Sequence, residues 1–209
     1  MQHTSARLQA RLRDARGLTL IELLMVVAIM GVIAAIAIPM SGNTLKYIKL
    51  SGDARDLSNA IAVAKMRAAA KFTFARVYID LSSKSYYLQT YNKTTSTWTT
   101  ETGSTTVSST VSFGYGPVSS APSNTQATIG QAAPCMTTGA TPAAVVNTAC
   151  IIFNSRGIPI DAITSGSPTG SDAAYLTDST AVYGITIAAT GFIRTWRTPY
   201  QYTPSWTQQ

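Results

Sequence analysis

The longest apolar run of the chain extends from residue 18 to residue 40 and contains one ionisable side chain, Glu22. About 20 apolar residues are enough for an α-helix to cross a hydrocarbon core of about 30 Å. The run is preceded by basic residues, Arg7, Arg11, Arg13 and Arg16, which are opposed only by Asp14. A basic flank followed by an apolar stretch is typical of a membrane anchor or a secretory signal, with the positive side in the cytoplasm.

A second helical pattern follows Pro39, which we expect to kink the helix rather than to end it. Apolar residues recur at spacings of four and three and predict one buried face: Leu50, Ala54, Leu57, Ile61, Ala64 and Ala68. The cations of this segment fall largely off that face and are expected in solvent: Lys46, Lys49, Arg55, Lys65, Arg67 and Lys71. One long helix over residues 18–72 is therefore predicted, with a lipid-compatible first half and an amphipathic second half.

After residue 72 the hydrophobic period changes to two, which is typical of strands. Residues 72–81 and 83–91 predict a hairpin, 106–117 predict a weaker strand, and 116–148 are expected to be loop. Residues 149–161 predict a strand, a turn at 154–157 and a short extended piece. Residues 183–189 predict a strand, followed by a turn at Gly191 and a final strand. The expected fold class is α+β, with the long helix packed across a carboxy-terminal antiparallel sheet.

Charge and cysteine content narrow the choice of function. The formal charge of the chain is +7. Without residues 1–17, twelve basic residues face eight acidic ones, and 12 − 8 leaves +4, so the basic balance is weak support for a nucleic-acid partner. Cys135 and Cys150 both follow the apolar run, and a pair on the exported side of a membrane is expected to form a disulfide. Two free thiols of a cytoplasmic protein are the alternative.

No catalytic or metal-binding pattern is present in the sequence. The single histidine, His3, precedes the apolar run, so a chain without its first residues could not build a Ser–His or Cys–His centre. The acidic residues that follow the run show no metal-loop spacing: Asp53, Asp56, Asp80, Glu101, Asp161, Asp172 and Asp178. We therefore expect a non-enzyme with no cofactor and no metal.

Three interpretations of the apolar run compete. A cleaved signal peptide would use Ala35-Ile36-Ala37, but the run is longer than usual and carries a carboxylate. A plain membrane anchor explains the length but not Glu22, because a carboxylate in a bilayer costs about 2.5–3.5 kcal/mol on insertion scales and normally has a partner. The third interpretation rests on Gly17, the residues Leu-Thr-Leu-Ile-Glu at 18–22, and the unbroken apolar helix that follows.

In these residues the chain resembles the type IV pilin and pseudopilin family. The resemblance implies that a prepilin peptidase removes residues 1–17 by cutting after Gly17 and that the new amine of Leu18 is methylated, although Phe is commoner there. It also implies that Glu22 pairs with the terminal amine of a neighbouring subunit, while pairing with its own Leu18 amine is the alternative. Residues 18–40 would then be the transmembrane and assembly helix, 41–72 an amphipathic helix, and 73–209 a β-sheet domain with Ser/Thr-rich loops.

The second half of the chain is similar to the H-type minor pseudopilins of type II secretion and to the FimT/FimU-type minor pilins. The similarity is carried by Phe-Asn-Ser-Arg-Gly at 153–157, by Thr190-Gly191 and by Ile193-Arg194. It implies a structural subunit of a type IV pilus or a type II secretion pseudopilus. The implied partners are other pilin subunits, the prepilin peptidase and an inner-membrane assembly platform. The implied location is the inner membrane, with a single span and a periplasmic carboxy-terminal domain.

The carboxy-terminal tail suggests a different class of function. Residues 191–209 combine Arg194 and Arg197 with aromatic residues, among them Trp196, Tyr200, Tyr202 and Trp206, and contain no acid, a mixture that can hold nucleic acid by phosphate contacts and base stacking. FimT-like pilins that bind DNA carry two arginines spaced two apart after the glycine, and here Phe192 replaces the first. A DNA-binding minor pilin for DNA uptake is thus the alternative, and aromatic packing on the sheet is the simpler expectation. An unassembled membrane-anchored domain is a third reading.

Overall fold

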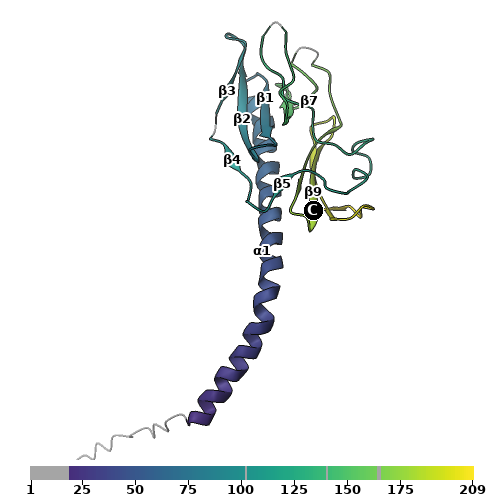
Figure 1. The fold of residues 1–209 in the computed structure, drawn as a ribbon. Helices are drawn as coiled ribbons and strands as arrows, with labels where there is room; N and C mark the ends of the chain where they lie inside the picture. The colour runs from purple at the N-terminus through teal and green to yellow at the C-terminus, as the bar shows by residue number, and fades with distance from the viewer. Residues whose placement is uncertain (1–18, 102, 140, 164–165) are drawn as a thin grey trace, which may run out of the picture. The chain divides into compact units, whose positions relative to one another are not determined.

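The computed structural model describes residues 19–101, 103–139, 141–163 and 166–209, with the side chains of residues 37–43 outside the description. A helix, α1 (Leu20–Ala70), is followed by short strands (Figure 1). The strands are β1 (Ala75–Asp80), β2 (Ser85–Asn92), β3 (Thr97–Thr100), β4 (Thr105–Thr106), β5 (Ser112–Phe113), β6 (Thr148–Phe153), β7 (Pro159–Ile160), β8 (Asp172–Thr177), β9 (Ala181–Ile187), β10 (Ile193–Pro199) and β11 (Thr207–Gln208). The chain divides into two compact units, Met1–Thr44 and Leu45–Gln209.

Both ends of α1 are formed by local signals. At the start, the N–H of Glu22 donates to the carbonyl of Thr19 at 3.0 Å and to Thr19 Oγ1 at 3.3 Å, so Thr19 is the N-cap. At the end, the N–H of Thr73 donates to the Ala68 carbonyl and that of Phe72 to the Ala69 carbonyl, which is a Schellman motif. Phe72 takes the left-handed position with φ 49°, where glycine is usual.

The second half of α1 buries the predicted apolar face. Each of its six members is fully buried: Leu50, Ala54, Leu57, Ile61, Ala64 and Ala68. They form one core with the inward-facing residues of two sheets. The cations of this segment are exposed, as expected, except for Lys65, which is half-buried.

The first sheet has the order β3-β2-β1-β6-β7, and β4 also pairs with β2. The predicted hairpin is present as β1 and β2, and the predicted strand, turn and extended piece are present as β6 and β7. Val77 of β1 lies opposite Leu88 of β2 and Ile151 of β6, and all three belong to the core beneath α1. Arg76 of β1 lies opposite Gln89 and Ile152 in the next row, which faces away from α1 because side chains alternate along a strand.

The second sheet differs from the expectation of a single sheet. Its order is β11-β10-β9-β8-β5, and the weak strand predicted over residues 106–117 is reduced to β5 in this sheet. No sequence pattern predicted β8, whose six residues are all buried. Ala174 and Leu176 face the core under α1, while Ala173 and Tyr175 face a second cluster on the other side. A strand buried on both faces has no alternating pattern, so periodicity cannot reveal it.

Two turns from different sheets meet at one lysine of α1. Lys65 Nζ donates to the Gly191 carbonyl at 2.9 Å, and the Lys65 stem would lie 3.0 Å from a Cβ added at Gly157. Gly191 has φ +77°, and a Cβ added there would lie 2.3 Å from the carbonyl oxygen of Gly157. The turn after β6 and the turn after β9 are therefore locked against each other and against α1. We call this contact of Lys65, Gly157 and Gly191 the turn clasp.

The turn clasp predicts a large cost for a side chain at Gly191. Gly191→Ala adds left-handed strain of about 1–2 kcal/mol and a backbone clash of about 1–3 kcal/mol, so thermal unfolding followed by circular dichroism should show a clear drop in Tm. Gly166→Ala is the matched control, because Gly166 has φ +61° and nothing within 4 Å of an added Cβ. Equal losses of Tm in the two variants would show that the clasp contributes nothing.

Candidate functional site

The first unit of the chain exposes an apolar helix surface. Every large apolar side chain between residues 20 and 36 is exposed, by 47% to 77%: Leu20, Ile21, Leu23, Leu24, Met25, Val26, Val27, Ile29, Met30, Val32, Ile33 and Ile36. A helix that is apolar on all sides requires a covering of lipid or of other protein. We call the exposed residues 20–36 the apolar helix surface.

Glu22 lies in the first turn of α1, inside the apolar helix surface, and is itself exposed. Thr19 and Glu22 have the Thr-x-x-Glu spacing of a capping box, in which a glutamate or glutamine can cap the helix start. Glu22 can therefore cap the start of the helix, in addition to the predicted pairing with an amine. Gly17 and Leu18, the predicted processing residues, lie outside the described residues.

The helix continues through position 39, so Pro39 does not end it. The Pro39 side chain lies outside the described residues, and the kink remains a prediction. Within the described part of the chain, no helix meets the length and apolarity needed to cross a membrane.

The two tail arginines lie on opposite faces of β10. Arg197 is paired with Tyr183, on the side that faces the core, and its guanidinium lies 5.2 Å from the ring centroid of Tyr47. Arg194 is paired with Thr186 on the other side and is exposed above the Phe192 ring. The structure thus does not bring Arg194 and Arg197 together into one phosphate-binding surface.

The tail tryptophans pack on the second sheet. Trp196 Nε1 donates to Thr186 Oγ1, and Trp206 Nε1 donates to the Ser120 carbonyl, both at 2.9 Å. The Trp206 ring lies 6.0 Å from that of Tyr175, which is fully buried. Packing on the sheet therefore accounts for Trp196 and Trp206, whereas the Tyr202 side chain is well exposed.

Cys135 and Cys150 form a disulfide, as predicted. Both residues are buried in a small cluster with Ile152 and Ile160 on the outer face of the first sheet. The Cys135 N–H donates to Thr148 Oγ1 at 2.9 Å. The bond ties the start of the loop at residues 135–147 to β6 and holds that loop over the sheet.

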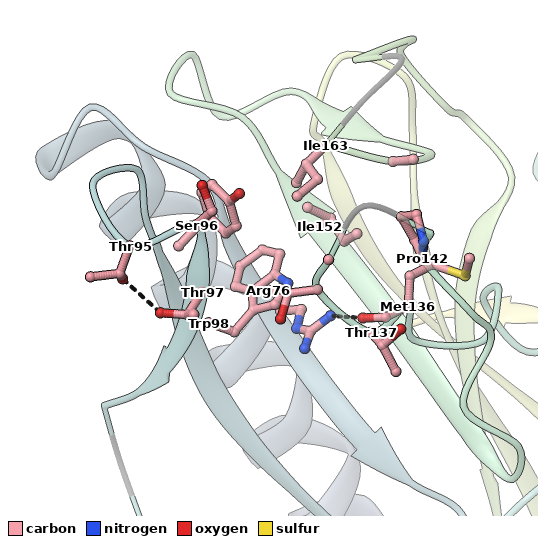
Figure 2. Close-up of a pocket in the computed structure, with 14 residues that line it drawn as sticks. Arg76, Thr95, Ser96, Thr97, Trp98, Met136, Thr137, Pro142, Ile152 and Ile163 are labelled. Atoms are coloured by element: carbon pink, nitrogen blue, oxygen red, sulfur yellow. Dashed lines mark hydrogen bonds between the residues drawn. The ribbon is translucent and has the colours of Figure 1, made fainter.

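A cleft of about 610 Å³ lies between this loop and the tip of the β2–β3 hairpin (Figure 2). The hairpin contributes Tyr91 and residues 95–98, and the loop contributes residues 136–139 and Pro142. Ile152 and Ile163 line it from the first sheet and from the segment after β7. Arg76 is the only Lys, Arg, Asp or Glu side chain among the described residues that line the cleft.

Arg76 is nearly fully buried and is held on several sides. Its Nε donates to Gln89 Oε1 at 2.8 Å, and its Nη1 donates to the Met136 carbonyl at 3.1 Å (Figure 2 draws the second bond). The guanidinium carbon lies 4.1 Å from the ring centroid of Trp98, a cation–π distance. Burial lowers the pKa of Arg76 to about 10, against a smaller opposing effect of Tyr78 and Tyr87.

This cleft was not predicted from the sequence. Arg76 is the only basic residue of β1 and lies at an outward-facing position, which is the one signal that could have marked the cleft. The cleft also needs a hairpin tip and a loop some forty residues later, and no local pattern brings these together.

The acidic residues form no metal centre within the described part of the chain, where no group of three potential metal ligands occurs. Asp172, at the start of β8, is the most perturbed of them. Burial raises the pKa of Asp172 to about 7, and the charge of Asp161 adds to the effect. A buried carboxyl without a catalytic partner is a stability feature rather than a reactive centre.

The amino-terminal segment matches one protein family. Residues 12–38 match the family described as the prokaryotic N-terminal methylation motif, and the match includes Gly17, Leu18 and Glu22. The chain therefore carries a prepilin-like methylation motif in its amino-terminal segment. The motif implies anchoring in the inner membrane through the N-terminal helix.

Among solved structures, the chain is similar to the minor pseudopilin EpsH from the type 2 secretion system of Vibrio cholerae, with a TM-score of 0.36 and 10% sequence identity. The similarity covers 77% of this chain and 96% of that chain. No curated protein matches the sequence. A likeness this distant carries no argument about function.

The raised pKa of Asp172 predicts a pH effect on stability. The folded state favours the protonated carboxyl, so the free energy of unfolding should fall as pH rises from about 4 through 7, between the ordinary pKa and the folded one. Asp172→Asn should flatten this fall when thermal unfolding is measured across that range, and Asp161→Asn should reduce it by less. Parallel profiles of wild type and Asp172→Asn would contradict the prediction.

Proposed function

We propose that this chain, with its prepilin methylation motif, is a minor pilin or pseudopilin, a structural subunit of a membrane-anchored filament. Prepilin peptidase would remove residues 1–17, and the new Leu18 amine would be methylated. The helix from residue 18 to residue 40 would anchor the subunit in the inner membrane and later pack in the filament core. The sheets would lie outside, in the periplasm.

The observation that carries this proposal is the methylation motif over residues 12–38, with Glu22 inside it. The apolar helix surface supports it, because exposed apolar side chains all around a helix need lipid before assembly and other subunits afterwards. A filament core and a bilayer are both apolar, so the same surface suits both environments.

Glu22 would set the offset between the helices of adjacent subunits in the filament. A carboxylate in an apolar core is costly unless it pairs with a positive charge, and cleavage after Gly17 creates such a charge at Leu18. Pairing with the amine of the next subunit would place adjacent helices at one defined offset. Breaking such a buried pair costs about 3–5 kcal/mol, which is enough to exclude a variant subunit from the filament.

The machine that uses the subunit is either a type IV pilus or a type II secretion pseudopilus, since the helix suits both. Deletion in the native host separates them, because loss of pili or twitching indicates the first and loss of secreted proteins indicates the second. The DNA-binding alternative has less support, because Arg194 and Arg197 lie on opposite faces of β10. Purified subunit that retains DNA in a gel shift at low salt would restore that alternative.

Processing gives the first test of the proposal. Mass spectrometry of the protein extracted from membranes should find a methylated amino-terminal peptide that begins at Leu18. Gly17→Val should leave residues 1–17 attached without preventing membrane insertion, since a bulkier side chain hinders cleavage at the scissile bond. A mature terminus beyond Ala37 would instead indicate a cleaved signal peptide and overturn the proposal.

Glu22 gives the second test, because charge pairing and helix capping make different demands. Glu22→Gln keeps a capping side chain but removes the charge, so the amount of this variant in sheared filaments should fall by a factor of at least about 100, as should that of Glu22→Ala. Immunoblots against the major subunit measure this incorporation, and membrane levels control for expression. Ile21→Ala, an exposed neighbour, is the matched control and should assemble normally. Incorporation of Glu22→Gln at the wild-type level would leave Glu22 with a capping role alone.

A further inference from the structure

The outer face of the first sheet contains a buried cation that this chain does not neutralise. Arg76 is 5% exposed, and no carboxylate lies within ion-pair distance of it among the residues that the structure describes. The ion pairs of the described residues join Arg67 and Lys71 to Glu101. Lysine, arginine and acidic side chains are almost never this buried unless they are paired, so Arg76 is an exception.

The contacts of Arg76 use part of its hydrogen-bonding capacity, and none of them supplies a negative charge. Its partners are the neutral oxygens of Gln89 and Met136 and the ring of Trp98. A guanidinium has five N–H donors, and these bonds use two of them. A flat guanidinium stacked on an indole still offers donors along its edge, which is the geometry that binds a carboxylate.

The cleft next to Arg76 has the size and lining of a small ligand site. Its volume of about 610 Å³ lies within the range of about 300–1,000 Å³ that is typical of such sites. Tyr91, Trp98, Ile152, Ile163 and Pro142 offer apolar walls. The hydroxyl side chains at the rim are Thr95, Ser96, Thr97, Thr137 and Thr138. Figure 2 shows hairpin, sheet and loop residues around one shared space.

We propose that this cleft binds a single carboxylate group joined to an aromatic or aliphatic body, with the carboxylate on Arg76 and the body against Trp98. One cation matches one negative charge, whereas a phosphate, with its greater charge, would call for further cations that the lining does not contain. The same chemistry occurs in a small organic acid and in an acidic side chain next to an apolar one in a protein segment. The site is independent of how the N-terminal helix is used.

The disulfide holds residues that contact or neighbour Arg76. Cys135 precedes Met136, whose carbonyl holds Arg76, and Cys150 lies next to the Arg76–Ile152 row on β6. The loop wall of the cleft is therefore fixed to the sheet close to the cation. A fixed wall reduces the ordering cost of binding.

The test compares probes that differ in the carboxylate alone. The full mature chain in lipid nanodiscs is titrated calorimetrically with indole-3-acetate and with its neutral isostere indole-3-acetamide, with empty nanodiscs subtracted. A hydrogen-bonded charge pair should make the acetate bind about tenfold more tightly. The capped peptides acetyl-Phe-Glu-Phe-amide and acetyl-Phe-Gln-Phe-amide form a second pair. Tighter binding of indole-3-acetate indicates a small organic acid as the ligand, and tighter binding of the glutamate peptide indicates a protein segment.

Two variants place the binding in the cleft. Arg76→Gln should abolish the preference for the acid, but it removes a buried group and could unfold the sheet. Thr138→Trp fills the cleft from an exposed rim position and should lower affinity at least tenfold while the fold is retained. Thr110→Trp, at an exposed threonine that does not line the cleft, is its matched control and should bind as wild type does.

Specific outcomes would overturn the proposal. Equal affinity for acid and amide in both probe pairs would show that the charge of Arg76 is not used. Binding that persists unchanged in Thr138→Trp would place the ligand elsewhere. No binding of any probe at millimolar concentration would leave Arg76 as a residue that holds the disulfide loop.

Discussion

The burial of one helical stripe against two sheets is the constraint on which the carboxy-terminal unit depends. Leu50, Leu57 and Ile61 share this stripe of α1 with three alanines, and every member of the stripe is fully buried. Burying a leucine or isoleucine contributes about 1.5–3 kcal/mol, while the alanines let the strands approach the helix closely. Both sheets direct their apolar rows at this stripe, so removing it would leave two sheets with no common core.

The turn clasp explains how two separate sheets keep their positions on one helix. Each sheet could slide along an apolar stripe, because hydrophobic contact has little directional preference. Lys65 adds a directed hydrogen bond to the turn after β9, and the tight backbone approach of Gly157 and Gly191 couples the two turns. The motif residues at 154–157 and 190–191 thus meet in space, although they belong to different sheets.

The outer faces of the sheets are covered by the long segment between β5 and β6. Val118 and Ile129 cover Tyr175 on the second sheet, and Cys135 covers Ile152 on the first. This segment has few apolar anchors, and a disulfide across a loop of this size contributes about 3 kcal/mol in the chain-entropy account. The Arg76 cleft lies where this cover is incomplete, between the disulfide loop and the β2–β3 tip.

Local sequence patterns were enough to predict the helix, its buried stripe, the β1–β2 and β9–β10 hairpins, and the disulfide pair. Each of these is encoded locally, by a period of 3.6 or 2, by turn residues, or by two cysteines alone in the chain. The methylation motif is equally local, since the peptidase and the neighbouring subunits would recognise the short segment at residues 12–38. Four features became visible in the folded chain alone: the division into two sheets, the strand β8, the opposite placement of Arg194 and Arg197, and the Arg76 cleft. These depend on which strands pair and on which faces become buried, and a chain pattern does not contain that information when a strand is covered on both sides or when distant loops meet.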